Sequence, residues 1–389
     1  MKRISLVAMM AVAGLFSTNA MAADLGGDCC ADLEERVAEL EATTARKGNR
    51  KVSLTIYGQV TTGVMFWDAE GNGIDESNTY VVDPQTSGTR FGFKGKASIN
   101  SEWSAGYQIE LQWQTADANK TTPGNSLTVD SDESLDAPEF RQAHWYIQSS
   151  RLGKIRVGQA DTANSGIAEI SVANELIADA MSSSHAGLGI IRNDLAGPAI
   201  NNFEFNRQNV VRYDTPTMAG FVFSAAWGED DLWDVALRYA GEFGGFKVAA
   251  GIAYGESTDS SNGIGGPDPA IEVVNGGASV MHMPTGLFVT VSAGQRDRDT
   301  FADEEVFWHL NAGIEQKWFA LGKTTVFGMV SEYDDAVEAS AQSWGLGVVQ
   351  KIDAAAMDLF ISYRSYELDN GAGVESDFDA VVGGGRIKF

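Results

Sequence analysis

Two short runs, FRQAHWYIQSS at 140–150 and LGKIRVGQA at 152–160, decide how this chain folds. In the first run Ala143, Trp145 and Ile147 are apolar and the residues between them are polar, and the second run alternates in the same way. Residues two apart share one face of a β-strand. The runs therefore predict a hairpin with an apolar face toward lipid and a polar face toward water.

The segment 160–206, which follows this hairpin, shows no strand alternation. Loops of this length without secondary structure of their own are uncommon unless they are functional. We expect the segment to fold back into a barrel and narrow it. The alternative is a solvated external loop whose acidic residues only aid solubility.

The N-terminus carries the features of an export signal. Lys2 and Arg3 precede the apolar run SLVAMMAVAGLF, and Ala20-Met21-Ala22 fits a cleavage site. Residues 1–22 are therefore expected to be a signal peptide that is removed on export. Loss of Lys2 and Arg3 changes the formal net charge from −25 to −27, and such acidity argues against nucleic acid as a partner.

Residues 23–48 contain a short amphipathic pattern. Leu33, Val37, Leu40 and Thr44 recur at spacings of four and three, with charged residues between them. This predicts a periplasmic helix of less than two heptads, which is too short to be stable alone. It is either held in a coiled coil by an oligomeric barrel or forms a flexible stub.

Residues 49–389 repeatedly show the same alternation of apolar and polar residues as the first hairpin. The chain has 43 Gly and only 8 Pro, and its mean hydropathy of −0.14 is near neutral, as expected for alternating membrane strands. We predict about sixteen antiparallel strands in an all-β transmembrane barrel, with short turns such as 100–102 alternating with long acidic connections at 68–88 and 115–139. The expected strands are 51–68, 90–99, 103–114, 140–150, 152–160, 207–214, 220–228, 232–241, 245–255, 271–282, 286–295, 304–316, 321–332, 342–351, 356–366 and 378–389.

Aromatic residues near the strand ends favour a membrane barrel over a soluble sandwich. We expect them on the lipid face, where they would form an interfacial girdle. They are Trp103, Trp113, Trp233, Tyr239, Phe246, Tyr254, Phe327 and Tyr333.

Basic residues within the predicted strands fall mostly on the polar face. A Lys or Arg on the lipid face costs about 2–4 kcal/mol near the bilayer midplane, so these residues must face a wet interior. We predict a pore-lining basic wall of Arg90, Lys94, Arg156, Arg212, Arg238 and Arg364.

Acidic residues lie instead in the connections, including the segment 160–206. If this segment folds inward, its carboxylates face the basic wall across a narrow gap and produce a transverse field. The candidate constriction acids are Asp161, Glu169, Glu175 and Asp179.

The whole mature chain resembles the general porins of alphaproteobacteria. The resemblance is carried in order by RKGNRKVSLTIYGQV at 46–60, RFGFKGKASI at 90–99, the first hairpin, NVVRYDTPTMAGF at 209–221 and the terminal IKF. It implies a homotrimer of sixteen-stranded barrels in the bacterial outer membrane, with a third external loop folded into each pore. It also implies passive diffusion of small hydrophilic solutes and contact with outer-membrane lipid and lipopolysaccharide.

The chain ends in a predicted membrane strand whose last residue is Phe389. This resembles the terminal signal that the barrel assembly machinery reads in bacterial outer-membrane proteins. The N-terminal helix is a candidate for contact with cell-wall material.

We find no pattern that indicates an enzyme, a metal site or a cofactor. The four His residues are scattered, and the only cysteines, Cys29 and Cys30, are adjacent. Besides a general diffusion channel, two hypotheses remain open. One is a solute-selective channel with a saturable binding site, and the other is an envelope tether that acts through the N-terminal helix.

Overall fold

The computed structural model describes residues 51–113, 116–124, 138–175, 178, 186–198, 200–228, 231–258, 270–299, 301 and 303–389. The predicted signal peptide at 1–22 and the predicted helix at 23–48 lie outside these residues.

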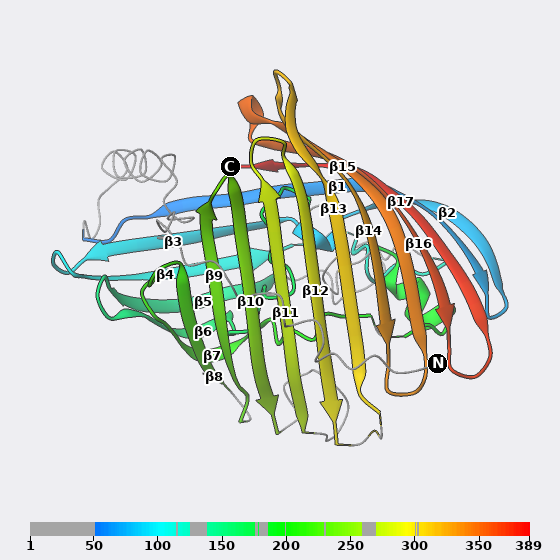
Figure 1. Cartoon of the computed structure of the whole chain (residues 1–389), viewed down its shortest axis with the longest axis horizontal. Helices are drawn as coiled ribbons and strands as arrows, with labels where there is room; N and C mark the ends of the chain where they lie inside the picture. The colour runs from blue at the N-terminus through cyan, green and yellow to red at the C-terminus, as the bar shows by residue number, and fades with distance from the viewer. Residues whose placement is uncertain are drawn as a thin grey trace.

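The described chain forms one antiparallel sheet of 17 strands, which closes into a barrel because β17 pairs with β1 (Figure 1). This confirms the predicted all-β barrel, and each of the predicted strands is present within a few residues of its expected bounds. The strands are β1 (Thr55–Gly71), β2 (Ile74–Val82), β3 (Arg90–Ser98), β4 (Trp103–Gln112), β5 (Glu139–Ser149), β6 (Gly153–Asp161), β7 (Arg207–Asp214), β8 (Phe221–Gly228), β9 (Trp233–Phe243), β10 (Phe246–Ser257), β11 (Ile271–His282), β12 (Leu287–Arg298), β13 (Glu305–Phe319), β14 (Gly322–Asp334), β15 (Ser340–Ile352), β16 (Met357–Asp369) and β17 (Glu375–Lys388).

The extra strand is β2, and it corrects the prediction that 68–88 is a connection. β2 pairs with the second half of β1, from Gly63 to Gly71, and β3 pairs with the first half, from Thr55 to Gln59. β2 and β3 therefore follow one another along the same edge of β1. Together they fill one position of a 16-strand wall.

The connections differ in length at the two ends of the barrel. The turn end carries the short turns and also the start of β1 and the end of β17, which pair at Gln59 and Lys388. The loop end carries the longer connections, including 113–138, 162–206 and 258–270. At the turn end, Gly244 and Gly245 join β9 to β10 with φ values of 57° and 83°, a conformation that glycine adopts without steric cost.

The outer face of the wall is apolar, as the alternation predicts. Ile56, Trp145, Trp227 and Ile361 all expose more than half of their surface. In a soluble protein such a surface would drive aggregation, whereas a closed barrel of this composition places it against lipid.

The inner face is not uniformly polar. Phe327 and Tyr333 are 3% exposed and face the interior, so the prediction that they belong to a lipid-facing girdle is wrong. They belong to an apolar region of the inner face on β11 to β17 and β1, which packs against residues from the connection between β6 and β7. Other inner-face members are Met65, Trp67, Val273, Phe307, Met329, Tyr366 and Phe378.

Candidate functional site

The connection from 162 to 206, here called the inner segment, lies against inward-facing positions of the wall. Small residues make room for it. A Cβ atom added to Gly277 on β11 would lie 2.3 Å from the Ile167 carbonyl oxygen, and one added to Gly251 on β10 would lie 2.7 Å from the Ile167 side chain. Glycine at these two positions therefore allows the backbone of the inner segment to approach the sheet closely.

Polar side chains of the wall hold the start of the inner segment. Asp234 on β9 accepts hydrogen bonds from the backbone N–H groups of Ala163 and Asn164, at 3.0 and 2.7 Å. Arg238, four residues further along the strand, donates to the carbonyl oxygens of Ala163 and Ser165, both at 2.7 Å. Backbone groups that would otherwise lack partners inside the barrel are thus satisfied by the wall.

Glu204 links the two ends of the inner segment, here called its arms: the stretch around Gly166 and Ala168 and the stretch around Glu204 itself. Its carboxylate accepts hydrogen bonds from the backbone N–H groups of Gly166 and Ala168, at 2.6 and 2.8 Å. Burial raises the pKa of Glu204 to about 8, and the nearby charge of Glu169 adds to the rise, while Arg238 and the two N–H donors oppose it.

This carboxyl group makes the packing of the inner segment pH-dependent. The folded-state pKa is above the ordinary value of 4.5, so Glu204 contributes stability that is complete below about pH 4.5 and is lost as pH rises through about 8. We expect current noise from the channel to increase between pH 6 and pH 9, because the two arms separate more often. Single-channel recordings at a series of pH values measure this noise.

Two variants check the assignment of this pH dependence. Glu204→Gln should flatten it, and Glu169→Gln should move its midpoint to lower pH by removing a neighbouring negative charge. Noise that rises equally in wild type and in Glu204→Gln would contradict the role of Glu204.

The far part of the inner segment packs on the apolar region of the inner face. Phe203 lies 5.2 Å from the ring of Phe307 and 5.9 Å from that of Tyr333, and the guanidinium of Arg296 lies 4.7 Å from its centroid. Ile190 and Ile191 of the short helix η5 (Ile190–Asp194) have no exposed surface. The inner segment is therefore held by apolar burial as well as by hydrogen bonds.

Three arginines from three strands lie together on the opposite part of the wall. Arg141 on β5 forms an ion pair with Glu110 at 2.8 Å, and Arg90 on β3 reaches the same carboxylate at 3.7 Å. Arg207, at the start of β7, pairs with Asp161 at 3.7 Å. The charges of Arg141 and Arg207 both act on Arg90, so the three form one cluster, here called the arginine cluster.

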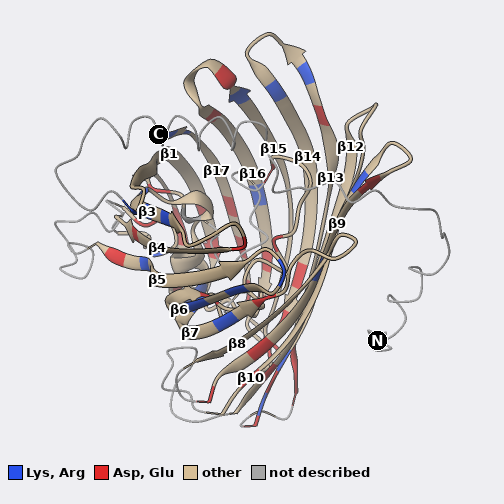
Figure 2. Ribbon diagram, turned by 90° about the vertical axis from the view of Figure 1, so that its left-hand side faces the viewer, with Lys and Arg blue, Asp and Glu red and all other residues tan. Residues whose placement is uncertain are grey.

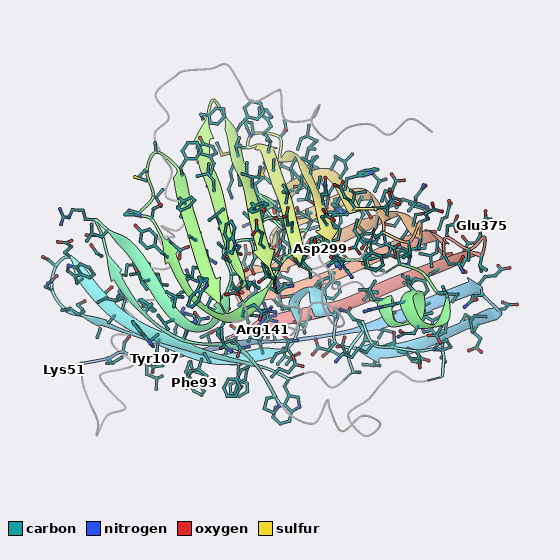
Figure 3. The ribbon with its side chains drawn as sticks, turned by 90° about the horizontal axis from the view of Figure 1, so that it is seen from below. Lys51, Phe93, Tyr107, Arg141, Asp299 and Glu375 are labelled. Carbon is teal, nitrogen blue, oxygen red and sulfur yellow. The ribbon has the colours of Figure 1, made fainter. Side chains whose placement is uncertain are left out.

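Figures 2 and 3 place this cluster in the barrel. Blue segments run along β5, β6 and β7 in Figure 2. In Figure 3, Arg141 lies between Lys51 at the turn end and Glu375 at the loop end, while Phe93 points away from the interior. The arginine cluster therefore lies part-way along the barrel axis.

The sequence reasoning missed Arg141 because of a β-bulge. Glu110 is opposite Gln142 and Leu111 is opposite Phe140, which leaves Arg141 as an extra residue. A bulge of this kind changes which face successive side chains occupy. The sequence does indicate this bulge. Phe140 and Trp145 are both apolar, but they are five residues apart, so a regular strand would place them on opposite faces. Arg207 was missed because it lies at the first residue of its strand.

The predicted basic residues occupy different positions. Arg90 belongs to the arginine cluster, and Lys94 lies 5.4 Å from the ring centroid of Tyr57 on β1. Arg156 and Arg212 both bind Asp214, at 2.6 and 2.8 Å, and Arg212 also donates to the Thr162 carbonyl oxygen at 2.6 Å.

The remaining two predicted basic residues contact neighbouring groups on the inner face. Arg238 holds the start of the inner segment, as described above. Arg364 donates to the Tyr366 hydroxyl at 3.2 Å and contacts the Met329 sulfur.

The predicted constriction acids are also spread out. Asp161 ends β6, where it pairs with Arg207 and accepts a hydrogen bond from Gln142 at 3.0 Å. Glu169 is partly exposed, and its charge acts on Arg207. Glu175 has no exposed surface and accepts a hydrogen bond from Ser171. Asp179 lies outside the described residues.

The described part of the chain contains no group of three or more His, Cys, Asp or Glu side chains arranged to hold a metal ion. Its helices include none that is long and apolar enough to cross a membrane.

Comparisons with known proteins agree with this architecture. A sequence model described as Gram-negative porin matches residues 6–371. Among solved structures, the anion-selective porin from Comamonas acidovorans is similar with a TM-score of 0.60 and 18% identity, covering 87% of this chain and 100% of that one. OmpF of Salmonella typhi, in a complex with daunomycin, gives 0.55 and 16%, covering 87% and 98%.

A third similar structure is the trimer form of OmpT of Vibrio cholerae, with a TM-score of 0.53 and 13% identity, covering 87% and 99% of the two chains. At these identities the structures show a shared fold. No protein in the curated set matches the chain significantly.

Proposed function

Because the chain belongs to the Gram-negative porin family, we propose that the inner segment and the arginine cluster together form the constriction of its channel. The family and the closed barrel identify the protein as a bacterial outer-membrane channel for passive diffusion of small hydrophilic solutes. On the inner segment, Glu169 is the acid placed to act across the constriction, since its charge reaches Arg207. We assign no such role to Glu175, because it has no exposed surface.

We propose that the constriction favours anions. The observation that carries this is the concentration of basic groups. The three guanidinium groups of the arginine cluster share the carboxylates of Glu110 and Asp161 within 4 Å. Beside them, Arg386, whose charge also acts on Arg90, and Lys388 share Asp358, so basic groups outnumber acidic ones even with Glu169 included. Local charge at the narrowest point decides ion selectivity, so the net negative charge of the whole chain does not require cation preference. The Comamonas acidovorans protein with the similar fold is itself an anion-selective porin.

We also propose a homotrimer, with lipid and lipopolysaccharide around it and with no enzymatic activity. The trimer form of the Vibrio cholerae protein supports the oligomeric state by analogy of fold. Contact of residues 23–48 with cell-wall material remains a prediction, as do the signal peptide at 1–22 and the division from the barrel at 49–389.

Recognition of Phe389 by the barrel assembly machinery is a further part of this proposal. The backbone of Phe389 exchanges hydrogen bonds with that of Gly58, at 2.9 and 3.0 Å, and the residue as a whole is 64% exposed. A terminal aromatic side chain on the outer surface, next to the seam between β17 and β1, is available for recognition before the seam closes.

Single-channel recording in planar bilayers under a KCl gradient tests the proposed function. We expect three equal closing steps from each inserted unit, and a reversal potential with the sign of anion preference. A reversal potential of the opposite sign would contradict the proposed constriction, single-step closure would contradict the trimer, and the absence of any conductance would contradict the channel.

A further inference from the structure

Lysines are unevenly distributed along the barrel axis. Among the described residues, every lysine except Lys120 lies toward the turn end, and Lys120 pairs with Asp117 at 3.7 Å. The strand register places a subset of the turn-end lysines on the inner face of β3 and β6. These are Lys94, Lys96 and Lys154, here called the lysine vestibule.

Two of these lysines lie over aromatic rings. The Nζ atom of Lys94 is 5.4 Å from the ring centroid of Tyr57, and that of Lys154 is 4.1 Å from the centroid of Tyr146. Neither forms an ion pair with any side chain that the structure describes. A cation–π contact orients an ammonium group and leaves its charge unneutralised.

The surroundings of Lys154 add to this excess of positive charge. The charges of Lys96, Arg156 and Arg212 all act on Lys154. The nearby carboxylate, Asp214, already accepts ion pairs from Arg156 and Arg212. Repulsion among these cations is relieved when a mobile anion enters, and it falls further for an anion that carries several charges.

The loop end has the opposite character. Carboxylates gather around both sides of the wall there. Asp68 is opposite Asp379 and Glu70 is opposite Asp377 on the outer side of the pairing of β1 with β17. On the inner side, Glu76 of β2 is opposite Ala69, and its charge acts on Asp194. Asp299 follows the end of β12 and Glu375 begins β17, so both also lie at the loop end. A multivalent anion is therefore repelled at the loop end and attracted at the turn end, which is expected to face the periplasm because it carries the short turns.

We propose that the lysine vestibule is a binding site for small multivalent oxyanions, such as solutes that carry phosphate groups. The inference rests on the proposed channel function and goes beyond it, because it assigns a ligand class to residues away from the arginine cluster. Lysine ammonium groups, which sit on flexible side chains, bind phosphate as point charges. They do not need the fixed planar geometry with which an arginine guanidinium donates two parallel hydrogen bonds. Such a site would make channel block depend on the side from which the anion arrives.

Block by tripolyphosphate tests this proposal. The mature chain is recorded in phosphatidylcholine bilayers at 0.1 M KCl, where the Debye length is about 10 Å, with tripolyphosphate added to one chamber at a time. We expect each inserted channel to be blocked from one chamber at a concentration about tenfold lower than from the other. In the variant K94Q/K154Q, the blocking concentration on the sensitive side should rise about tenfold and remove the difference.

The matched control is K120Q/R298Q, which removes the same formal charge from two ion-paired residues at the loop end and should retain one-sided block. Equal block from both chambers in wild type would overturn the proposal, as would one-sided block that survives in K94Q/K154Q. If the double variant does not insert, the single variants K94Q and K154Q must each show part of the loss. A wild-type protein that produces no conductance would instead refute the channel function.

Discussion

Replacing the arginine cluster should convert the channel from anion preference to cation preference. In R90Q/R141Q/R207Q, Glu110, Asp161 and Glu169 remain at the constriction without their basic partners. Each charge contributes about 1 kcal/mol at 4 Å even in water, so the ratio of anion to cation permeability should fall by roughly tenfold or more. The reversal potential under a KCl gradient measures this ratio.

A control with the same loss of formal charge is K120Q/R151Q/R298Q. Lys120 and Arg298 lie at the loop end, and Arg151 is an exposed residue of the turn at 150–152. This variant should keep the wild-type reversal potential. An equal shift in the two variants would show that overall charge sets the selectivity, and no shift in the first would exclude the arginine cluster from the constriction.

The second large effect is expected from Gly277→Leu. A side chain at this position meets the Ile167 carbonyl oxygen at 2.3 Å, which is too close for any contact, so the inner segment must move away from the wall. Movement away from the wall is movement into the channel. Overpacking of this kind typically costs about 1–3 kcal/mol, and we expect conductance to fall by about twofold.

The neighbouring residue provides the control for this variant. Gly276 has only the Gly251 carbonyl oxygen near its added Cβ, at 3.4 Å, and it faces the outside of the barrel. Gly276→Leu should therefore leave conductance unchanged. If Gly277→Leu conducts like wild type with its barrel intact, the inner segment does not border the conducting path at Ile167.

The extra strand β2 shows why two-residue alternation does not find every strand. Its sequence IDESNTYVV has polar residues on both faces, since Asp75 and Ser77 alternate with Glu76 and Asn78. β2 lies at the loop end, where no lipid face is required. Its pairing with β1 is formed by backbone hydrogen bonds, which leave no mark in the side-chain pattern.

The strand β14 shows a second limit. Val326 and Val330 lie on one face, and Phe327, Met329 and Tyr333 lie on the other, so alternation alone does not tell which face is inside. Phe327, Met329 and Tyr333 can face the interior because residues of the inner segment pack in the same apolar cluster and cover it. Interior packing partners came from a segment more than one hundred residues away in the sequence.

The sequence by itself determined the barrel, its membrane-facing surface and the family, because lipid imposes an apolar side chain at every second position of each spanning strand. Only the tertiary structure decided which charges meet. A bulge of one residue brought Arg141 beside Arg90, Arg156 and Arg212 came to share the single carboxylate of Asp214, and burial removed Glu175 from the channel surface. These contacts depend on strand register and on the path of the inner segment, and both are fixed by interactions between residues far apart in the chain.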